Sequence, residues 1–259
     1  MRDVRLFCWN VNGIRAVGKK GFLDWLCQES PEVLCLQETK ATPDQLDEGL
    51  RQPRGYYAYW NFPEKKGYGG VATLCREKLV LVQNGFGIPR FDIEGRVIIS
   101  EHPGFKLFNI YFPNGKKDET RLKFKLDFYD AFLDYVAPLQ AREERLIVCG
   151  DFNTAHKETD LARPKANEKF SGFLPIERKW MDKFVAHGFT DTFRYFNKEP
   201  HQYTWWDLKS GARERNVGWR IDYFFVTENL LGSVKQAFIM KEVMGSDHCP
   251  VGIILETDR

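Results

Sequence analysis

The 259-residue sequence has no apolar run near the length of a membrane span. A transmembrane helix needs about 20 consecutive apolar residues, and no segment approaches that length. The chain runs from Met1 directly into a strand-like segment, Val4–Trp9, without the pattern of a signal peptide. These absences predict a soluble intracellular protein without a membrane partner, and we expect a cytoplasmic location.

Cysteine motifs are also missing. None of the six cysteines, at positions 8, 27, 35, 75, 149 and 249, has the close spacing of a zinc or redox motif. Cys8, Cys35, Cys75 and Cys149 lie in apolar runs. We therefore expect buried free thiols in a reducing compartment rather than disulfides.

Linkers, internal repeats and a strong net charge are absent as well. No Gly/Ser tract, Pro-rich spacer or long block of like charge divides the chain, and 43% of its residues are hydrophobic. This composition supports one large domain or two small ones with a full core. The net charge of +2 neither demands nor excludes a nucleic-acid partner.

Strand-like apolar runs alternate with helical segments along the chain. The predicted strands are residues 4–9, 33–37, 70–75, 97–100, 105–112, 145–149, 221–226 and 251–256, and the predicted helices include 20–27, 119–136 and 176–187. In the longest helix, the apolar stripe Leu122, Leu126, Tyr129 and Leu133 is expected to face the core. Interleaved strands and helices predict an α/β or mixed layered protein.

One strand-like run ends in a carboxylate and an amide two residues apart. After Cys149, the chain passes through Gly150 into Asp151 and Asn153. Side chains two apart in an extended segment point to the same side, so these two would project together. Alone, the segment favours a turn, because Asp, Asn and Gly are common turn residues.

Polar residues also lie at five other strand-like runs. Asn10 with Asn12 follow one run and Glu38 follows another, Tyr111 with Asn114 end one, Asp222 lies inside one, and Asp247 with His248 precede the last. Each has an ordinary alternative, such as a surface ion pair of Glu38 with Lys40. Asp222 has either Arg220 or a histidine as its candidate partner. Random turns explain the whole set poorly, since sites in layered α/β proteins form at strand ends.

Convergence of Glu38, Asp151, Asp222 and Asp247 would require cations. Two carboxylates about 4 Å apart repel by about 4 kcal/mol at an effective dielectric near 20. Oxygen donors without a cysteine or histidine cluster select Mg²⁺ or Mn²⁺ over zinc. With amides and Tyr111 as donors to phosphate oxygens, the set predicts metal-assisted phosphoester hydrolysis.

Aromatic and cationic residues gather near the C-terminal third of the chain. Trp205, Trp206 and Trp219 fall within 15 positions and are interleaved with Arg213, Arg215 and Arg220. Arginine suits phosphates and aromatic faces suit a sugar or base. The alternative is a tryptophan-rich corner of the core with surface arginines.

The motifs NVNG, LQETK, NIYFPNG, GDFNTAH, RIDYFF and SDHCP follow one another from Asn10 to Pro250. This set resembles the exonuclease III-like apurinic/apyrimidinic (AP) endonucleases. The resemblance implies a single domain over residues 1–259 with the DNase I-like fold, a four-layered α/β sandwich of two mixed sheets flanked by helices.

The same resemblance implies a Mg²⁺-dependent DNA-repair phosphodiesterase, with Mn²⁺ as a substitute, that incises duplex DNA 5′ to abasic sites and leaves a 3′-hydroxyl. Removal of 3′ blocks, 3′→5′ exonuclease activity and incision at deoxyuridine are further expected activities. We expect a monomer associated with the nucleoid through its substrate.

The resemblance also implies roles for individual residues. Glu38 resembles the main metal ligand, with Asn10, Asp151, Asn153, Asp247 and His248 in the predicted metal set. Asp151 resembles the group that activates water or protonates the leaving oxygen, and Asn153 the amide that orients phosphate or water. His248, held by Asp222, resembles the imidazole at the phosphate, and Tyr111 the phenol at the scissile phosphate.

The predicted DNA-binding residues are Asn12, Asn114, Lys116, Lys117, Trp205, Arg215 and Trp219. Trp205 and Trp219 resemble the walls of a pocket for a flipped-out abasic sugar. Two departures are visible: some members have Asp in place of Asn12 and Phe in place of Trp205. One rival is a relative that cleaves a small phosphoester and would not need these tryptophans; another is a nucleic-acid-binding module without catalysis.

Overall fold

Two six-stranded sheets face each other in the computed structural model, which describes residues 2–65, 67–208 and 211–257. The first sheet has the order β13 (Val234–Ile239), β14 (Val251–Thr257), β1 (Arg2–Asn10), β2 (Val33–Gln37), β4 (Val71–Cys75) and β3 (Tyr57–Asn61). The second has the order β5 (Val82–Asn84), β6 (Val97–His102), β7 (Phe105–Tyr111), β8 (Leu146–Asp151), β12 (Asp222–Thr227) and β9 (Phe189–Asp191).

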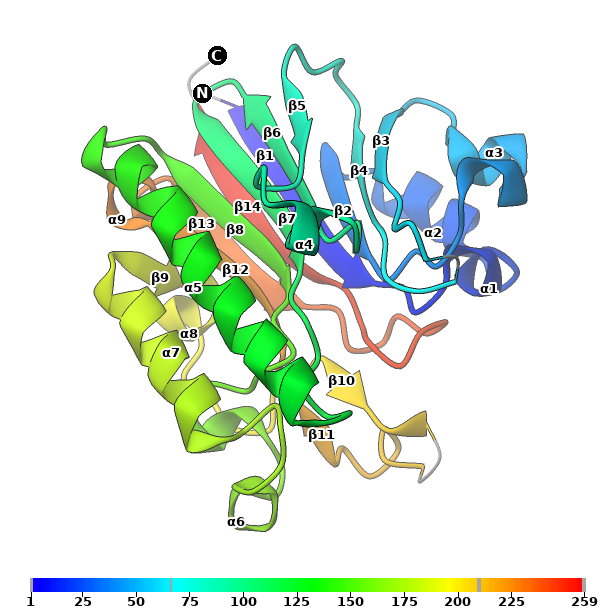
Figure 1. The fold of residues 1–259 in the computed structure, drawn as a ribbon. Helices are drawn as coiled ribbons and strands as arrows, with labels where there is room; N and C mark the ends of the chain where they lie inside the picture. Colours follow the sequence, from blue (N-terminus) through cyan, green and yellow to red (C-terminus); the bar gives the residue numbers. More distant parts are fainter. Residues whose placement is uncertain (1, 66, 209–210, 258–259) are drawn as a thin grey trace.

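Both sheets are mixed. The pairs β1/β2 and β7/β8 are parallel, and the other pairs within the two sheets are antiparallel. A short hairpin, β10 (Trp205–Trp206) with β11 (Gly218–Trp219), lies below the sheets in Figure 1, at the opposite end from the two termini.

Helices cover the outer face of each sheet (Figure 1). The described helices are α1 (Ile14–Gly18), α2 (Phe22–Glu29), α3 (Glu48–Arg51), α4 (Pro89–Asp92), α5 (Glu119–Ala141), α6 (Pro164–Asn167), α7 (Pro175–Ala186), α8 (Thr192–Phe196) and α9 (Glu228–Leu231). Helices α1 to α3 share a core with the first sheet, and α5 and α7 share one with the second. The four-layered sandwich is therefore confirmed. Within the described residues, no helix has the length and apolar character needed to cross a bilayer.

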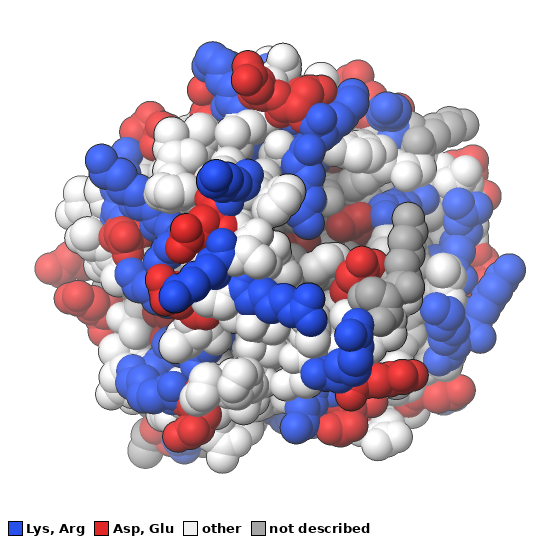
Figure 2. Space-filling view, turned by 90° about the horizontal axis from the view of Figure 1, so that it is seen from below, with Lys and Arg blue, Asp and Glu red and all other residues white. Residues whose placement is uncertain are grey.

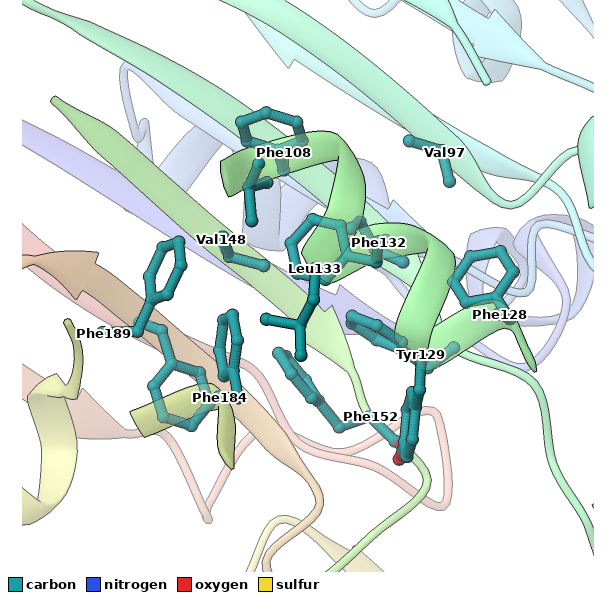
Figure 3. Packing of buried hydrophobic residues seen from close by; sticks show 14 of the residues in the cluster. Val97, Phe108, Phe128, Tyr129, Phe132, Leu133, Val148, Phe152, Phe184 and Phe189 are labelled. Atoms are coloured by element: carbon teal, nitrogen blue, oxygen red, sulfur yellow. The ribbon is translucent and has the colours of Figure 1, made fainter. Parts of the chain in front are cut away.

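Helix α5 differs from the prediction in its length and its buried face. It continues past Pro138 to Ala141, and buried Leu139 anchors the added turn. Of the predicted stripe, Tyr129 and Leu133 are buried, whereas Leu122 and Leu126 are only half-buried. Phe128 and Phe132 are buried in the core cluster with Tyr129 and Leu133, and Figure 3 shows these four side chains of α5 within it.

A third core fills the space between the two sheets. It is built from alternate residues of strands in both sheets, including Cys8, Cys35, Leu107, Cys149 and Phe224. Their neighbours in the sequence face the helices instead. The cysteines predicted to be buried, Cys8, Cys35, Cys75 and Cys149, are buried free thiols. The two sheets share this core, and a single domain over residues 1–259 stays a prediction.

Candidate active site

The predicted site forms where the inter-sheet core meets solvent. Side chains alternate along a strand, so residues two positions beyond an inter-sheet residue face the same space. Asn10 follows Cys8 in this way, Tyr111 follows Asn109, and Asp151 follows Cys149. Asp222 precedes Phe224 on the antiparallel strand β12 and faces the same space. Strand alternation thus brings polar ends of four strands together.

A carboxylate group with a histidine lies at the centre of the site. One ligand atom each from Glu38, Asp151 and His248 lies within 4.8 Å of the others. The Asn10 amide Nδ2 donates to Glu38 Oε1 and to Asp151 Oδ2, each at 2.9 Å. The donor therefore bridges the two carboxylates, one from each sheet.

The turn that carries Glu38 has an unusual backbone. Asn12, Glu38 and Lys40 all have a positive φ, between 46° and 51°, a region that non-glycine residues rarely adopt. The turn is held by backbone hydrogen bonds, from Gly13 N to Glu38 O at 2.7 Å and from Lys40 N to Gly69 O at 2.9 Å. The surrounding structure maintains this strain, as is common at functional sites.

Asp151 and Asn153 form a compact turn at the end of β8. Asn153 N donates to Asp151 Oδ1 at 2.7 Å, and Asn153 Nδ2 donates to Phe112 O at 2.9 Å. Asn114 Nδ2 donates to Asn153 Oδ1 at 2.9 Å. The segment is therefore both a turn, as its composition suggested, and a part of the site.

His248 is fixed by a buried carboxylate. Its Nδ1 lies 2.9 Å from Asp222 Oδ2, and its Nε2 lies 3.9 Å from Asp151 Oδ2. Thr204 Oγ1 donates to the same Asp222 oxygen at 2.6 Å. Of the two candidate partners of Asp222, the histidine is the one in contact, because Arg220 binds Asp160 and Asp191 instead.

The charges at this site shift one another's pKa values. Burial, together with Asp222 and Glu38, raises the pKa of Asp151 to about 7. Burial opposes a charge on His248, but Asp222, Asp151 and Asp247 outweigh it and raise the pKa of His248 to about 10. Burial also opposes the charge on Glu38, and Lys40 and Asn10 overcome it to lower that pKa. At neutral pH, His248 is therefore a cation and Asp151 is poised to exchange a proton.

Tyr111 lies at the same end of the sheets, on β7. It is buried, and burial together with Glu38 raises the pKa of its phenol well above the ordinary value. The Arg96 guanidinium lies 4.6 Å from its ring centroid and donates to its carbonyl at 2.9 Å. Tyr111 therefore keeps its proton and is available as a donor.

The two positions that depart from the family pattern meet at one carboxylate. Asn12 Nδ2 donates to Asp247 Oδ1 at 2.9 Å, and Trp205 Nε1 donates to Asp247 Oδ2 at 3.0 Å. Lys40 Nζ donates to Asn12 Oδ1 and lies 2.7 Å from Glu38 Oε2. The predicted ion pair of Glu38 with Lys40 is thus present within the site.

An aromatic hollow of about 650 Å³ adjoins this group, with Trp205, Trp219 and Lys116 in its lining. The Lys116 ammonium lies 5.0 Å from the Trp205 ring centroid and 5.6 Å from that of Trp219. Lys117 and Arg215 are exposed. Figure 2, viewed from the end of the molecule that carries β10 and β11, shows many Lys and Arg side chains with acidic ones among them.

Two of the arginines interleaved with the tryptophans have structural roles instead of free surface positions. The alternative of surface arginines does not hold for Arg220, which is buried and paired with Asp160 at 2.8 Å and Asp191 at 2.7 Å. Arg213 donates to the carbonyls of Lys241, Val243 and Ser246 at 2.6 to 3.2 Å. The composition of the segment did not reveal either structural role, because the partners of these arginines lie far away in the sequence.

Sequence reasoning missed the residues that support the site. Thr204 holds Asp222, and Lys125 Nζ donates to Asn153 O at 2.8 Å while pairing with Glu177 at 2.6 Å. The signal for Lys125 was its position on the buried face of α5, where an ammonium requires a partner. Thr204 left no comparable signal.

The donor set fits a hard divalent cation. Glu38 and Asp151 offer carboxylate oxygens, and burial, together with the negative charges of Asp222 and Glu38, raises the pKa of Asp151. A divalent cation would relieve that repulsion, and it would be held by Glu38 and Asp151 with His248 or Asn10 nearby. Asp247 is not part of this group of three, and its two oxygens accept hydrogen bonds from Asn12 and Trp205.

This geometry suits a hydrolase of phosphate esters, and comparison with known proteins agrees with it. The Endonuclease/Exonuclease/phosphatase family model matches residues 7–248. The chain is 42% identical over 254 residues to the exodeoxyribonuclease of Bacillus subtilis (strain 168), covering 97% of this chain and 99% of that protein. It is 41% identical over 256 residues to the DNA repair nuclease APEX1 of Danio rerio, covering 98% and 82%.

Solved structures give the same result. An AP endonuclease from Leishmania major matches with a TM-score of 0.90 at 30% identity, covering 99% of this chain and 89% of that one. A Neisseria 3′ phosphatase bound to a product DNA hairpin matches with a TM-score of 0.88 at 29% identity, covering 99% and 100%. The chain belongs to the Endonuclease/Exonuclease/phosphatase family, and it is an enzyme of the exonuclease III type within it.

Proposed function

We propose that the protein is a Mg²⁺-dependent DNA-repair phosphodiesterase that incises duplex DNA on the 5′ side of an abasic site and leaves a 3′-hydroxyl. The observation that supports this most is that Trp205, which lines the hollow together with Trp219, lies beside His248 of the Glu38–Asp151–His248 group, with ring centroids 6.5 Å apart. A flipped-out sugar in that hollow would place its phosphate at the acid–base groups.

Each residue of the site has a role in the proposed reaction that follows from its charge. Protonated His248, oriented by Asp222, donates to a phosphate oxygen and stabilises the charge that develops on it. Asp151, with a pKa of about 7, takes a proton from the attacking water or gives one to the leaving oxygen. Asn153 and Tyr111 add neutral donors. Mg²⁺, for which Mn²⁺ is a substitute, would polarise the phosphate when bound.

The hollow favours DNA over a small phosphoester. A small substrate would need the charged group but not two tryptophans with Lys116 between them. Asn12, Asn114, Lys117 and Arg215 are proposed as further DNA contacts. We also propose that the protein acts on 3′-blocked ends and at deoxyuridine. We propose that it is a cytoplasmic monomer that associates with the nucleoid through its DNA substrate.

One cleavage assay tests this function. Matched duplexes that carry an abasic site, a deoxyuridine, a 3′-phosphate or only normal bases are incubated with Mg²⁺ and with excess EDTA. We expect rapid incision of the abasic duplex that EDTA abolishes. Equal cleavage of the abasic and undamaged duplexes would contradict abasic specificity, and unchanged cleavage in EDTA would contradict the metal assignment.

A further inference from the structure

A continuous chain of hydrogen bonds joins the aromatic hollow to the metal-binding carboxylate. It runs from Trp205 Nε1 to Asp247 Oδ2 at 3.0 Å and from Asn12 Nδ2 to Asp247 Oδ1 at 2.9 Å. It continues from Lys40 Nζ to Asn12 Oδ1 and ends at Glu38 Oε2, 2.7 Å from the same ammonium. Each polar group in this chain contacts the next one.

Backbone hydrogen bonds hold the segments that carry this series of hydrogen bonds. Trp206 N donates to Asp247 O at 3.0 Å, and Cys249 N donates to Thr204 O at 2.8 Å. These bonds pair the backbone around the β10/β11 hairpin with the segment that carries His248. Ser246 Oγ donates to Asn10 O at 2.8 Å and lies 3.2 Å from Asp247 Oδ1. A displacement of the Trp205 ring is therefore passed to Asp247 rather than absorbed by a mobile loop.

We propose that Asp247 is a positioning residue that couples filling of the aromatic hollow to cation binding at Glu38. This inference rests on the proposed function, since it assumes that DNA enters the hollow. It gives Asp247 a positioning role, because Asn12 donates to one of its carboxylate oxygens and Trp205 to the other.

The direction of the coupling follows from the charges. A cation at Glu38 repels the Lys40 ammonium, which then interacts more strongly with Asn12 Oδ1. Polarised in this way, Asn12 becomes a stronger donor to Asp247. Asp247 in turn becomes a weaker acceptor for the indole, so that Trp205 is freer to adjust around a sugar. The cation and the hollow-filling substrate thus favour each other's binding, and the effect is reciprocal.

The test measures binding without catalysis. Fluorescence anisotropy gives the affinity for two uncleavable duplexes of one sequence, one with a tetrahydrofuran abasic analogue and one undamaged, in EDTA and in Mg²⁺. We expect Mg²⁺ to strengthen binding of the abasic duplex by about fivefold more than binding of the undamaged duplex, the lower end of typical coupling. The undamaged duplex corrects for the general attraction of phosphates to a bound cation.

Two variants separate the coupling from the shape of the hollow. Trp205→Phe keeps an aromatic wall but removes the N–H that reaches Asp247. The extra factor by which Mg²⁺ strengthens binding of the abasic duplex over the undamaged one should therefore fall to about one. Trp219→Phe alters the opposite wall and should weaken abasic binding while keeping the factor. Mn²⁺ binding followed by electron paramagnetic resonance gives the reciprocal measurement, in which the abasic duplex should tighten Mn²⁺ binding in wild type but not in Trp205→Phe.

The outcomes distinguish this inference from the proposed function. An unchanged factor in Trp205→Phe, or its loss in Trp219→Phe to the same degree, overturns the coupling. Failure of the wild-type protein to prefer the abasic duplex in any condition overturns the proposed function instead.

Discussion

At the scale of single residues, Asp151 has the environment of a proton-transfer group. It is buried, its carboxylate contacts Asn10 and Asn153, and its pKa is raised to about 7. We expect Asp151→Asn to lower kcat by about 10²–10⁴-fold, the usual contribution of general acid–base catalysis. DNA affinity should change little, because the amide keeps the shape of the side chain. Single-turnover cleavage with a parallel binding assay measures both, and a loss under tenfold would contradict this role.

His248 should remain protonated well above neutral pH because of Asp222. In the protein without metal, burial disfavours its charge but Asp222, Asp151 and Asp247 raise its pKa to about 10. The ion pair therefore stabilises the fold fully below the unfolded pKa of about 6.5 and loses this effect as pH rises through about 10.

Asp222→Asn should lower the pKa of His248. Nuclear magnetic resonance of the histidine ring in EDTA measures it directly: the wild-type resonance should stay in its protonated position at pH 8, and the variant should titrate at a lower pH. His102 provides an internal control, because burial lowers its pKa to about 4 and it does not contact Asp222. Identical titration of His248 in both proteins would show that Asp222 does not hold its charge.

At the scale of elements, the end of β8 depends on a glycine. Gly150 has a φ of +147°, and a Cβ there would lie 1.7 Å from the Ile110 carbonyl oxygen on the adjacent strand β7. Backbone cannot move aside as a flexible side chain can, so Gly150→Ala should destabilise the protein by at least about 2 kcal/mol.

Chemical denaturation of Gly150→Ala and Gly232→Ala provides the comparison. Gly232 has no heavy atom within 4 Å of an added Cβ and an ordinary φ of −62°, so its replacement should leave the free energy of unfolding nearly unchanged. Equal stability of the two variants would mean that β7 and β8 are not packed as described.

Strand alternation explains why much of the site was predictable. Asn10, Tyr111, Asp151 and Asp222 continue the alternation that places cysteines and aliphatic side chains between the sheets. Their positions at strand ends predicted that they belong to one site, and the alternation seen in the structure gives the physical reason. The link from Trp205 to Asp247 was not predictable, because it joins residues 42 positions apart through a tertiary contact. The structural roles of Arg213 and Arg220 were hidden for the same reason.

At the scale of the whole molecule, the site places negative charge at the junction of the two sheets. Glu38 directly follows β2 of the first sheet and Asp151 ends β8 of the second, and their ligand atoms lie within 4.8 Å of each other. A divalent cation bound there would join both sheets and relieve the repulsion between them. Because a ligand that binds only the folded state stabilises it, Mg²⁺ should raise the thermal unfolding midpoint.

The expected shift of the thermal unfolding midpoint depends on the concentration of Mg²⁺ and on the charge of Glu38. At 100 times its Kd, a single cation stabilises the fold by about 2.7 kcal/mol, so the midpoint should rise steadily with Mg²⁺. Glu38→Gln keeps the size of the side chain but removes the charge, and its midpoint should hardly respond to Mg²⁺. Exposed Glu48, on α3, is a matched control: Glu48→Gln should keep the full response. Scanning calorimetry across a Mg²⁺ series decides between specific binding and general salt screening, because screening would shift all three proteins alike.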